Sequence, residues 1–225
     1  MRMRRKKNLP QRLKACSEYL FSPEHPDLND AVAINFNAYL DFKEIFKNDN
    51  PVMLEIGCGK GQFAVEIAKR NPDINYIAVE KLANVIIVGA EAAQKLELKN
   101  LRFLECGAEY LEGYIPEKSI DGIYLNFSCP FPKNTYENRR LTNQKYLKIY
   151  KKILKPNAEI HQKTDNMHFF EYSIEEFTKA GFKIKNVSLD LHNSNFEGNI
   201  ITEYESKFVA KGFPIYRLEA YQKED

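Results

Sequence analysis

The sequence lacks several features that would place it in a specialised class of protein. Its 225 residues include no tryptophan and only four cysteines, Cys16, Cys58, Cys106 and Cys129. No two of these cysteines form a C-x-x-C pair, so neither a disulfide framework nor a zinc site is indicated, and a reducing compartment is the simpler interpretation. The four histidines also lack the spacing of metal ligands, and we expect no metal.

Long apolar runs are absent as well. No stretch approaches ~18 consecutive apolar residues, and the N-terminus has no apolar signal-peptide core. We therefore expect a cytoplasmic protein that does not associate with a membrane. Charge of one sign is not in excess, because 33 basic and 31 acidic residues leave a net charge of +2. With 44% hydrophobic residues, the composition is that of an ordinary globular protein with a full core.

The basic residues are unevenly distributed, and several lie at the N-terminus. The first seven residues include Arg2, Arg4, Arg5, Lys6 and Lys7. We expect residues 1–30 to form a basic arm and residues 31–225 to form a single domain. Such an arm is suited to contact nucleic acid, because each neutralised phosphate releases a counterion. A solvated, frayed terminus explains the same charges equally well.

The most informative stretch is a glycine-rich turn between a predicted strand and a predicted helix. The apolar run 52–56 predicts a buried strand, and the pattern from residue 62 to 70 predicts a helix. Between them lie Gly57, Gly59 and Gly61, which allow a sharp turn and a close approach of a ligand to the backbone. This arrangement is typical of the nucleotide-binding corner of a Rossmann-like sheet.

The spacing of these glycines favours one cofactor. A dinucleotide fingerprint is G-x-G-x-x-G, whereas this chain has G-x-G-x-G, so no pyrophosphate need be bound. The next predicted strand, residues 76–80, ends in Glu80, whose carboxylate can accept both hydroxyls of a ribose. A purely structural turn is the alternative for the glycines alone. Together, the two features favour S-adenosylmethionine (AdoMet), which carries a ribose and an amino acid tail.

Predicted strands and helices alternate along the chain. We expect strands over residues 52–56, 76–80, 101–104, 120–127, 158–163, 182–191 and 213–220, and helices over residues 31–48, 62–70, 82–96, 141–154 and 167–180. This alternation predicts an α/β fold with a mostly parallel sheet, an antiparallel C-terminal strand and helices on both faces. The expected fold class is the Rossmann-like sheet of class I methyltransferases.

Further candidate residues follow the third and fourth strands. In AdoMet folds the loop after the third strand, here with Ala108, lies against the adenine. Asn126, near the end of the fourth predicted strand, is another candidate cofactor residue. After Asn126, prolines and aromatic residues alternate with the cations Lys133, Arg139 and Arg140. Such a loop suits a splayed-out nucleobase and its phosphates. A rigid loop that packs on the core is the alternative.

Several short motifs make a more specific pattern. They occupy residues 1–4, 54–61, 71–77, 124–128, 139–142, 163–166 and 202–205. Together these motifs resemble the bacterial tRNA (guanine-N7-)-methyltransferase family along almost the whole chain. The resemblance implies that a methyl group passes from AdoMet to N7 of a guanine in the variable loop of tRNA.

The resemblance also implies roles for individual residues. Glu55 and Glu80 bind the cofactor in this scheme. The residues that bind the substrate are Lys133, Asp165, Thr202, Glu203, Tyr204 and Glu205. The last four also fit a helix capping box, with Thr202 at the N-cap and Glu205 three residues later. Asp165-Asn166 could likewise cap the helix that follows it.

The sequence departs from the family pattern at three places. Cys129 stands where the family has its presumed catalytic aspartate, so no catalytic residue is assigned. The family's basic cluster after Lys133 is diluted to Asn134-Thr135-Tyr136, and Gly107 replaces an aspartate that contacts the cofactor in many members. A catalytically weakened tRNA-binding protein that retains the fold is therefore the alternative function. The sequence leaves the oligomeric state open.

The missing aspartate need not abolish methyl transfer. Guanine N7 has a lone pair in the ring plane and no proton at neutral pH, so its attack on a sulfonium methyl group requires no general base. Asp165, Glu203 or Glu205 could accept hydrogen bonds from the guanine edge and balance the charge that develops on the ring. Methylation of an exocyclic amine is disfavoured, because those enzymes commonly have an Asn/Asp-Pro-Pro-aromatic run where this chain has Cys129-Pro130-Phe131.

Overall fold

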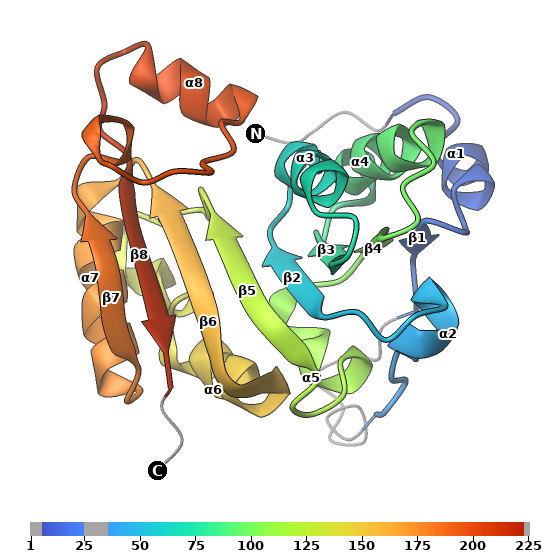
Figure 1. Ribbon diagram of the computed structural model, residues 1–225, viewed down its shortest axis with the longest axis horizontal. Helices are drawn as coiled ribbons and strands as arrows, with labels where there is room; N and C mark the ends of the chain where they lie inside the picture. Colours follow the sequence, from blue (N-terminus) through green and yellow to red (C-terminus); the bar gives the residue numbers. More distant parts are fainter. Residues whose placement is uncertain (1–5, 25–35, 223–225) are drawn as a thin grey trace. The chain divides into compact units, whose positions relative to one another are not determined.

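The structure is a computed structural model that describes residues 6–24 and 36–222. The chain divides into two compact units, residues 1–116 and residues 117–225, which we call the first and the second unit (Figure 1). Within the described residues, no helix combines the length and the apolar character that crossing a bilayer requires.

The described residues of the first unit form four parallel strands in the order β1-β4-β3-β2. The strands are β1 (Leu20–Phe21), β2 (Val52–Ile56), β3 (Asn75–Val79) and β4 (Leu101–Leu104). The helices are α1 (Leu9–Ala15), α2 (Phe42–Phe46), α3 (Gln62–Arg70), α4 (Ala83–Lys95) and α5 (Leu111–Tyr114). The register pairs Ile56 with Val79 and Val79 with Leu104, so β2, β3 and β4 end side by side.

The core of the first unit is formed by β-strand residues and by the apolar faces of α3 and α4. Leu54, Ile77 and Ile86 are completely buried. One buried polar side chain ties the ends of these elements together, because the Asn100 amide donates hydrogen bonds of 2.9–3.0 Å to the carbonyls of Ala68, Asn71 and Ile74. Because the side-chain N–H groups of Asn100 are hydrogen-bonded, burying them does not cost the free energy of an unsatisfied donor.

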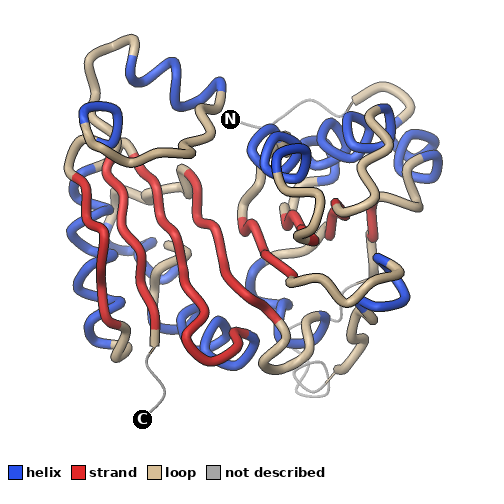
Figure 2. Tube along the Cα trace, in the orientation of Figure 1, coloured by secondary structure: helices blue, strands red, loops and turns tan. Residues whose placement is uncertain are grey.

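Up to residue 222, the second unit has four strands in the order β5-β6-β8-β7 (Figure 2). They are β5 (Ile120–Asn126), β6 (Leu154–Thr164), β7 (Lys183–Ser188) and β8 (Tyr216–Tyr221). β5 and β6 are parallel, and β8 runs antiparallel to both β6 and β7. The helices are α6 (Gln144–Ile153), α7 (Met167–Lys179) and α8 (Glu203–Val209). In Figure 1, α6 and α7 lie behind these strands, and α8 lies beyond the ends of β5 and β6.

These two sets of strands confirm the predicted mostly parallel α/β fold with an antiparallel C-terminal strand. The prediction of a helix over residues 31–48 is wrong for the described part of that range, residues 36–48, in which only α2 is helical. The amides of Ala38 and Leu40 instead bond to the carbonyls of Gly113 and Tyr114, and the Asp41 side chain caps a helix that begins only after it.

Part of the predicted basic arm is also described. Residues 9–15 form α1, and β1 pairs in parallel with β4. Arg12 in α1 forms an ion pair of 2.6 Å with Glu91 in α4, so this cation already has a partner within the first unit. Residues 1–5 lie outside the described residues, and the proposed domain boundary at residue 30 stays a prediction.

Candidate functional site

The first unit brings most of the predicted cofactor residues to one edge of its strands. The amides of Gly57 and Cys58 donate hydrogen bonds of 2.8 and 2.9 Å to the carbonyl of Val79, the last residue of β3. Glu80 follows Val79 directly, and Glu55 precedes the turn in β2. The glycine turn and both carboxylate-bearing segments therefore meet at the carboxyl ends of neighbouring parallel strands, where ligands bind in such sheets.

The glycines of this turn have different roles. Gly57, Gly59 and Gly61 all have a positive φ, of 79°, 57° and 74°. A Cβ atom at Gly59 would meet no atom within 4 Å, so open space lies beside the backbone there. A Cβ atom at Gly61 would lie 2.8 Å from the Phe103 ring and 2.9 Å from the Cα atom of Gly89. Gly61 is thus explained by the packing of α3 against α4 and β4, whereas Gly59 leaves room for a ligand.

Two carboxyl side chains lie at this edge. Glu55 is only 4% exposed, and Glu80 is half-buried, with its carboxylate accepting a 3.1 Å hydrogen bond from the amide of Leu82. Burial raises the pKa of the Cys58 thiol, and the charges of Glu55 and Glu80 raise it further, so both carboxylates lie close to the turn. The predicted residue Ala108 is buried at the start of a 3-10 turn that follows β4.

The first unit therefore fits AdoMet. Carboxylates accept hydrogen bonds from the hydroxyl and ammonium groups that AdoMet carries, and their charge favours its positive sulfonium group. The open side of Gly59 leaves space at the turn. The remaining predicted cofactor residue, Asn126, ends β5 in the second unit and is 9% exposed.

The loop after β5 is held in an unusual backbone conformation. Phe127 and Phe131 have φ angles of 51° and 41°, a region that bulky residues rarely adopt. Each such residue costs on the order of 1–3 kcal/mol. Arg140 stabilises the loop, because its buried guanidinium donates hydrogen bonds of 2.9 and 3.1 Å to the carbonyls of Pro130 and Phe131. Arg140 was predicted to contact phosphate, but the structure gives it this internal role.

The other cations of the loop remain accessible. Lys133 and Arg139 are exposed, and the guanidinium of Arg139 lies 4.7 Å from the ring centroid of Tyr136. Cys129, at the position of the family aspartate, is also exposed. The neighbouring Ser128 hydroxyl is buried and has no hydrogen-bond partner among the described residues. A bound ligand would supply such a partner.

The second unit brings together residues that are far apart in the sequence. Asp165 follows β6 and is half-buried, and burial raises the pKa of its carboxyl. Tyr204 at the start of α8 is 45% exposed, and its ring centroid lies 5.0 Å from that of Phe127. Burial raises the pKa of Tyr204, and the neighbouring Asp165 and Cys129 contribute to the same shift. A carboxylate, a thiol and two aromatic rings therefore gather beside the loop after β5.

Glu205 lies in the same region but is engaged internally. Its carboxylate is completely buried and accepts hydrogen bonds from Lys163 at 2.8 Å, His192 at 2.8 Å and Asn199 at 2.7 Å. The Lys163 ammonium also donates to Asn199 and to the carbonyl of Ile200. We call these four side chains the Lys163–Glu205 network. It connects α8 and the segment before it to β6.

The capping expectations are confirmed in part. The Thr202 hydroxyl accepts a 3.2 Å hydrogen bond from the amide of Glu205, as an N-cap residue does, but the Glu205 side chain bonds to the network. Asn166 caps α7 by accepting a 2.8 Å hydrogen bond from the amide of Phe169. Glu203 is exposed and forms an ion pair with Lys207.

Sequence reasoning missed the partners of Glu205. His192 lies in a short 3-10 helix, Leu191–Asn193, and Asn199 lies in the irregular segment that follows it; nothing in their spacing marks them. The buried Lys163 did offer a signal, because a lysine inside a predicted strand needs a partner of opposite charge. A cavity of about 410 Å³ beside the same loop was also not predicted; Pro130, Asn166 and Tyr172 are among its lining residues.

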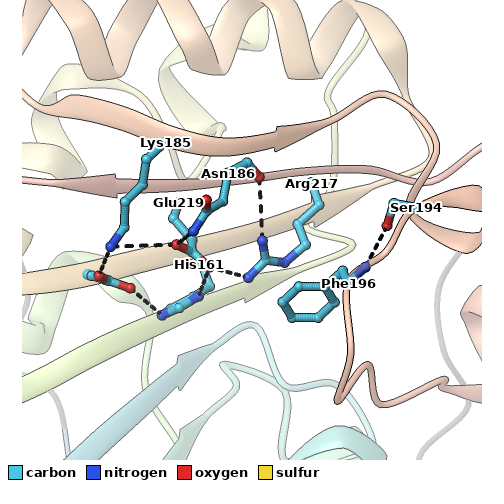
Figure 3. Close-up of polar contacts among 8 residues, drawn as sticks. His161, Lys185, Asn186, Ser194, Phe196, Arg217 and Glu219 are labelled. Atoms are coloured by element: carbon cyan, nitrogen blue, oxygen red, sulfur yellow. Dashed lines mark hydrogen bonds and ion pairs between the residues drawn. The ribbon is translucent and has the colours of Figure 1, made fainter.

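A second polar cluster lies on the strands of the second unit (Figure 3). One ligand atom each of Glu159, His161 and Glu219 lies within 4.8 Å of the others, an arrangement that could hold a metal ion. However, Lys185 bonds to Glu159 and Arg217 bonds to Glu219, so cations already compensate both carboxylates. Burial lowers the pKa of His161. The expectation of no metal stays a prediction.

Comparison with known proteins identifies the fold and the family of this chain. The sequence profile of a family described as putative methyltransferase matches residues 49–218. Among solved structures, the 16S rRNA methyltransferase KamB superposes with a TM-score of 0.61 at 16% identity, covering 84% of this chain and 96% of that one. A SAM dependent methyltransferase from Aquifex aeolicus has a TM-score of 0.55 at 14% identity over 96% of this chain and 98% of that one. These structures confirm the predicted class I methyltransferase fold.

Curated relatives give a narrower result. The tRNA (guanine-N(7)-)-methyltransferase of Geobacillus sp. (strain WCH70) is 51% identical over 178 residues, which cover 79% of this chain and 81% of the relative. The protein of the same name from Bacillus cytotoxicus is 43% identical over 221 residues, covering 98% of this chain and 96% of the relative. This chain therefore belongs to the tRNA (guanine-N(7)-)-methyltransferase family.

Proposed function

We propose that the protein transfers the methyl group of AdoMet to N7 of a guanine in the variable loop of tRNA. The observation that supports this most directly is the glycine turn fixed to the end of β3 beside Glu55 and Glu80, in a chain of this family. The methyl donor is AdoMet, whose sulfonium supplies an electrophilic methyl group when it is bound. A bacterial enzyme of this kind acts in the cytoplasm, where its tRNA substrate is found.

The cofactor residues have distinct roles in this proposal. The Glu80 carboxylate accepts hydrogen bonds from the ribose hydroxyls, and its bond from the Leu82 amide fixes its orientation. The buried Glu55 provides negative charge near the turn. Gly57 and Gly59 allow the backbone to approach the ligand. Ala108 and Asn126 complete the proposed set of cofactor residues.

Asp165 is the proposed recognition group for the guanine. A carboxylate that accepts from the N1–H and N2–H₂ groups holds the ring in place and balances the positive charge that develops when N7 is methylated. Because Asp165 is half-buried, its charged form lacks part of its hydration, and the donors of a guanine edge would replace it. The exposed ring of Tyr204 lies beside it and provides a stacking face.

The remaining proposed substrate residues divide into two groups. Lys133 and Arg139 are exposed and suited to contact phosphates, and Glu203 is exposed at the start of α8. Arg140, Thr202 and Glu205 are buried, and their polar groups bond within the protein. We propose that these three contribute by holding the loop after β5 and the first turn of α8 in position.

Residues 1–7 are a further proposed contact to tRNA. Of the described part, the backbone amide of Lys6 donates to Asn84, which leaves its ammonium group available for a phosphate. Deletion of residues 1–7 should weaken tRNA binding and reduce its salt dependence. An unchanged salt slope would contradict a contact between these residues and RNA.

The direct test is methylation of an unmodified tRNA transcript by the purified protein with AdoMet, followed by mapping of the modified base. We expect one 7-methylguanosine in the variable loop. Absence of this product under conditions where the protein binds AdoMet would contradict the proposal.

The weakened tRNA-binding protein is the second candidate, because Cys129 replaces the family aspartate. The variant Cys129→Asp separates the two. If Asp165 alone supplies the carboxylate that the reaction needs, the single-turnover rate of Cys129→Asp should differ from that of the natural protein by less than about 10-fold. A gain on the order of 100- to 1,000-fold, equivalent to one missing electrostatic partner, would show that the natural protein is impaired.

A further inference from the structure

Four aromatic rings form a row along α8, the last helix of the second unit. The ring centroids of Phe127 and Tyr204 are 5.0 Å apart, those of Tyr204 and Phe208 are 4.7 Å apart, and those of Phe208 and Phe213 are 5.9 Å apart. Phe127 lies in the loop after β5, and the other three belong to α8 and its C-terminal turn. We call these four side chains the aromatic row.

Much of the aromatic row faces solvent. Tyr204 is 45% exposed and Phe213 is 50% exposed, and Ile201 beside the start of α8 is 53% exposed. A single exposed apolar side chain needs no explanation, but a contiguous exposed set is typical of a binding surface.

Helix capping explains only one contact of the aromatic row. Gly212 has a φ of 81°, its amide bonds to the carbonyl of Val209, and the amide of Phe213 bonds to the carbonyl of Phe208. This is a Schellman motif, which commonly includes an apolar contact between the residues that stand here as Phe208 and Phe213. Any large apolar side chain would satisfy that contact. The motif therefore does not require a ring at position 213, and it does not involve Tyr204.

A cation lies beside the aromatic row. The ammonium of Lys211 lies 5.5 Å from the ring centroid of Phe208, and Lys211 forms no ion pair with any described residue. The nearby pair of Lys207 and Glu203 is neutral overall. Aromatic rings interleaved with a cation form the surface on which unpaired bases stack while their phosphates are neutralised.

We propose that the aromatic row binds unpaired RNA nucleotides by stacking, with Lys211 at a phosphate. The row leads from Tyr204, beside Asp165, to Phe213, and so would accept nucleotides that neighbour the target guanine. This inference rests on the proposed function, because that function makes RNA the substrate. It also explains how the protein could hold a loop nucleotide whatever its base, since every base has a face that can stack.

The test uses the full-length protein and a short single-stranded RNA that contains 2-aminopurine, a base whose fluorescence falls when it stacks. The informative variant is Phe213→Leu, because leucine keeps the apolar contact of the Schellman motif but removes the ring. We expect roughly 5- to 150-fold weaker binding and less quenching. Phe213→Tyr restores a ring and should restore both. Thermal unfolding measured in parallel shows whether each variant is folded.

Two matched variants sharpen the result. Phe196→Leu removes another exposed ring of the second unit, which lies against the guanidinium of Arg217 (Figure 3). Phe196 is not part of the aromatic row, so this variant should leave RNA binding unchanged. Lys211→Gln should lower the slope of log Kd against log salt by about 0.7, the value for one phosphate contact to a single strand. Phe213→Leu should leave that slope unchanged, because stacking releases no counterion.

Several outcomes would overturn the inference. One is equal quenching of 2-aminopurine by Phe213→Leu and by the natural protein. Another is binding of the same RNA as a duplex with the same affinity as the single strand. A third is a Phe213→Leu variant that loses self-association but binds RNA as the natural protein does. If Phe213→Leu is unfolded, Tyr204→Leu takes its place and must reduce quenching. The proposed function can be contradicted independently of this inference. Quenching that persists in a protein that makes no 7-methylguanosine would contradict the methyl transfer and leave the aromatic row intact.

Discussion

In the first unit the candidate ligand residues are positioned mainly by the backbone, whereas in the second unit they are positioned mainly by side chains. The glycine turn is fixed by two amides on the carbonyl of Val79, and the ends of β2, β3 and β4 are aligned by strand register. In the second unit, α8 is connected to β6 by the Lys163–Glu205 network, and the loop after β5 is held by Arg140.

This difference has an energetic consequence. A turn fixed by main-chain hydrogen bonds tolerates most side-chain changes, provided that the glycines remain. A buried ion pair does not, because removal of one partner leaves the other charged and desolvated. The substrate side of this protein should therefore be more sensitive to single substitutions than the cofactor side.

The largest effect is expected for Glu205→Ala. This change leaves the Lys163 ammonium buried without its carboxylate and should destabilise the second unit by about 3–5 kcal/mol. Denaturant unfolding measures the loss. Glu203→Gln is the matched control, because it breaks an exposed ion pair and should change stability by less than about 1 kcal/mol.

A double variant tests the role of this pair further. Lys163→Met with Glu205→Met replaces both charges by apolar side chains and should recover most of the stability. If Glu205 only stabilises the fold, methylation should recover as well. If the network positions Tyr204, kcat should stay low while stability returns. Equal losses of stability in Glu203→Gln and Glu205→Ala would contradict the stabilising role of the buried Lys163–Glu205 pair.

The next effect concerns Asp165. Asp165→Asn keeps the shape of the side chain but replaces an acceptor that two guanine donors require. We expect a loss of about 2.7–4 kcal/mol of transition-state stabilisation, which lowers the single-turnover rate about 100- to 1,000-fold. The Kd for AdoMet should not change. A matching loss of AdoMet affinity would show that the two roles are reversed.

The same carboxyl predicts a pH dependence. Burial raises the pKa of Asp165 above its ordinary value of 3.8. The active form is the carboxylate, so activity is present above the raised pKa and is lost as the pH falls through it. The acid limb of the rate profile should therefore lie at a higher pH than an exposed aspartate would give. Asp165→Asn should lack this limb.

A smaller effect is expected for Glu80→Gln. Hydrogen bonds to a charged acceptor contribute about 1.5–3 kcal/mol, so the Kd for AdoMet should rise by roughly 10- to 150-fold. Isothermal titration with AdoMet measures this change, and the rate at saturating AdoMet should be nearly unaffected. Unchanged affinity would remove Glu80 from the cofactor site.

The two glycines with different surroundings give the smallest effect. Alanine at either Gly59 or Gly61 must adopt a positive φ, but only at Gly61 does it also clash with Phe103 and Gly89. Gly61→Ala should therefore be less stable than Gly59→Ala by about 1–3 kcal/mol. Gly59→Ala should instead weaken AdoMet binding. Equal stabilities of the two variants would contradict a packing role for Gly61.

The sequence by itself determined the alternation of strands and helices, the glycine turn, and the carboxyl groups of Glu55 near the end of β2 and of Glu80 after β3. These features are local, because apolar periodicity and glycine spacing act within a few residues. The helix α3 and the strand β2 therefore have the bounds that the pattern predicted. The N-caps Thr202 and Asn166 were predictable for the same reason.

Only the tertiary structure decided which polar side chains remain available to a ligand. The sequence treated Arg140 and Glu205 like Lys133 and Asp165, yet the first two are buried and bonded internally. The partners of Glu205 lie 6 to 42 residues away along the chain, so no local pattern connects them. Burial depends on the packing of segments that are distant in sequence, and that packing separates the residues that position the site from those that can bind the substrate.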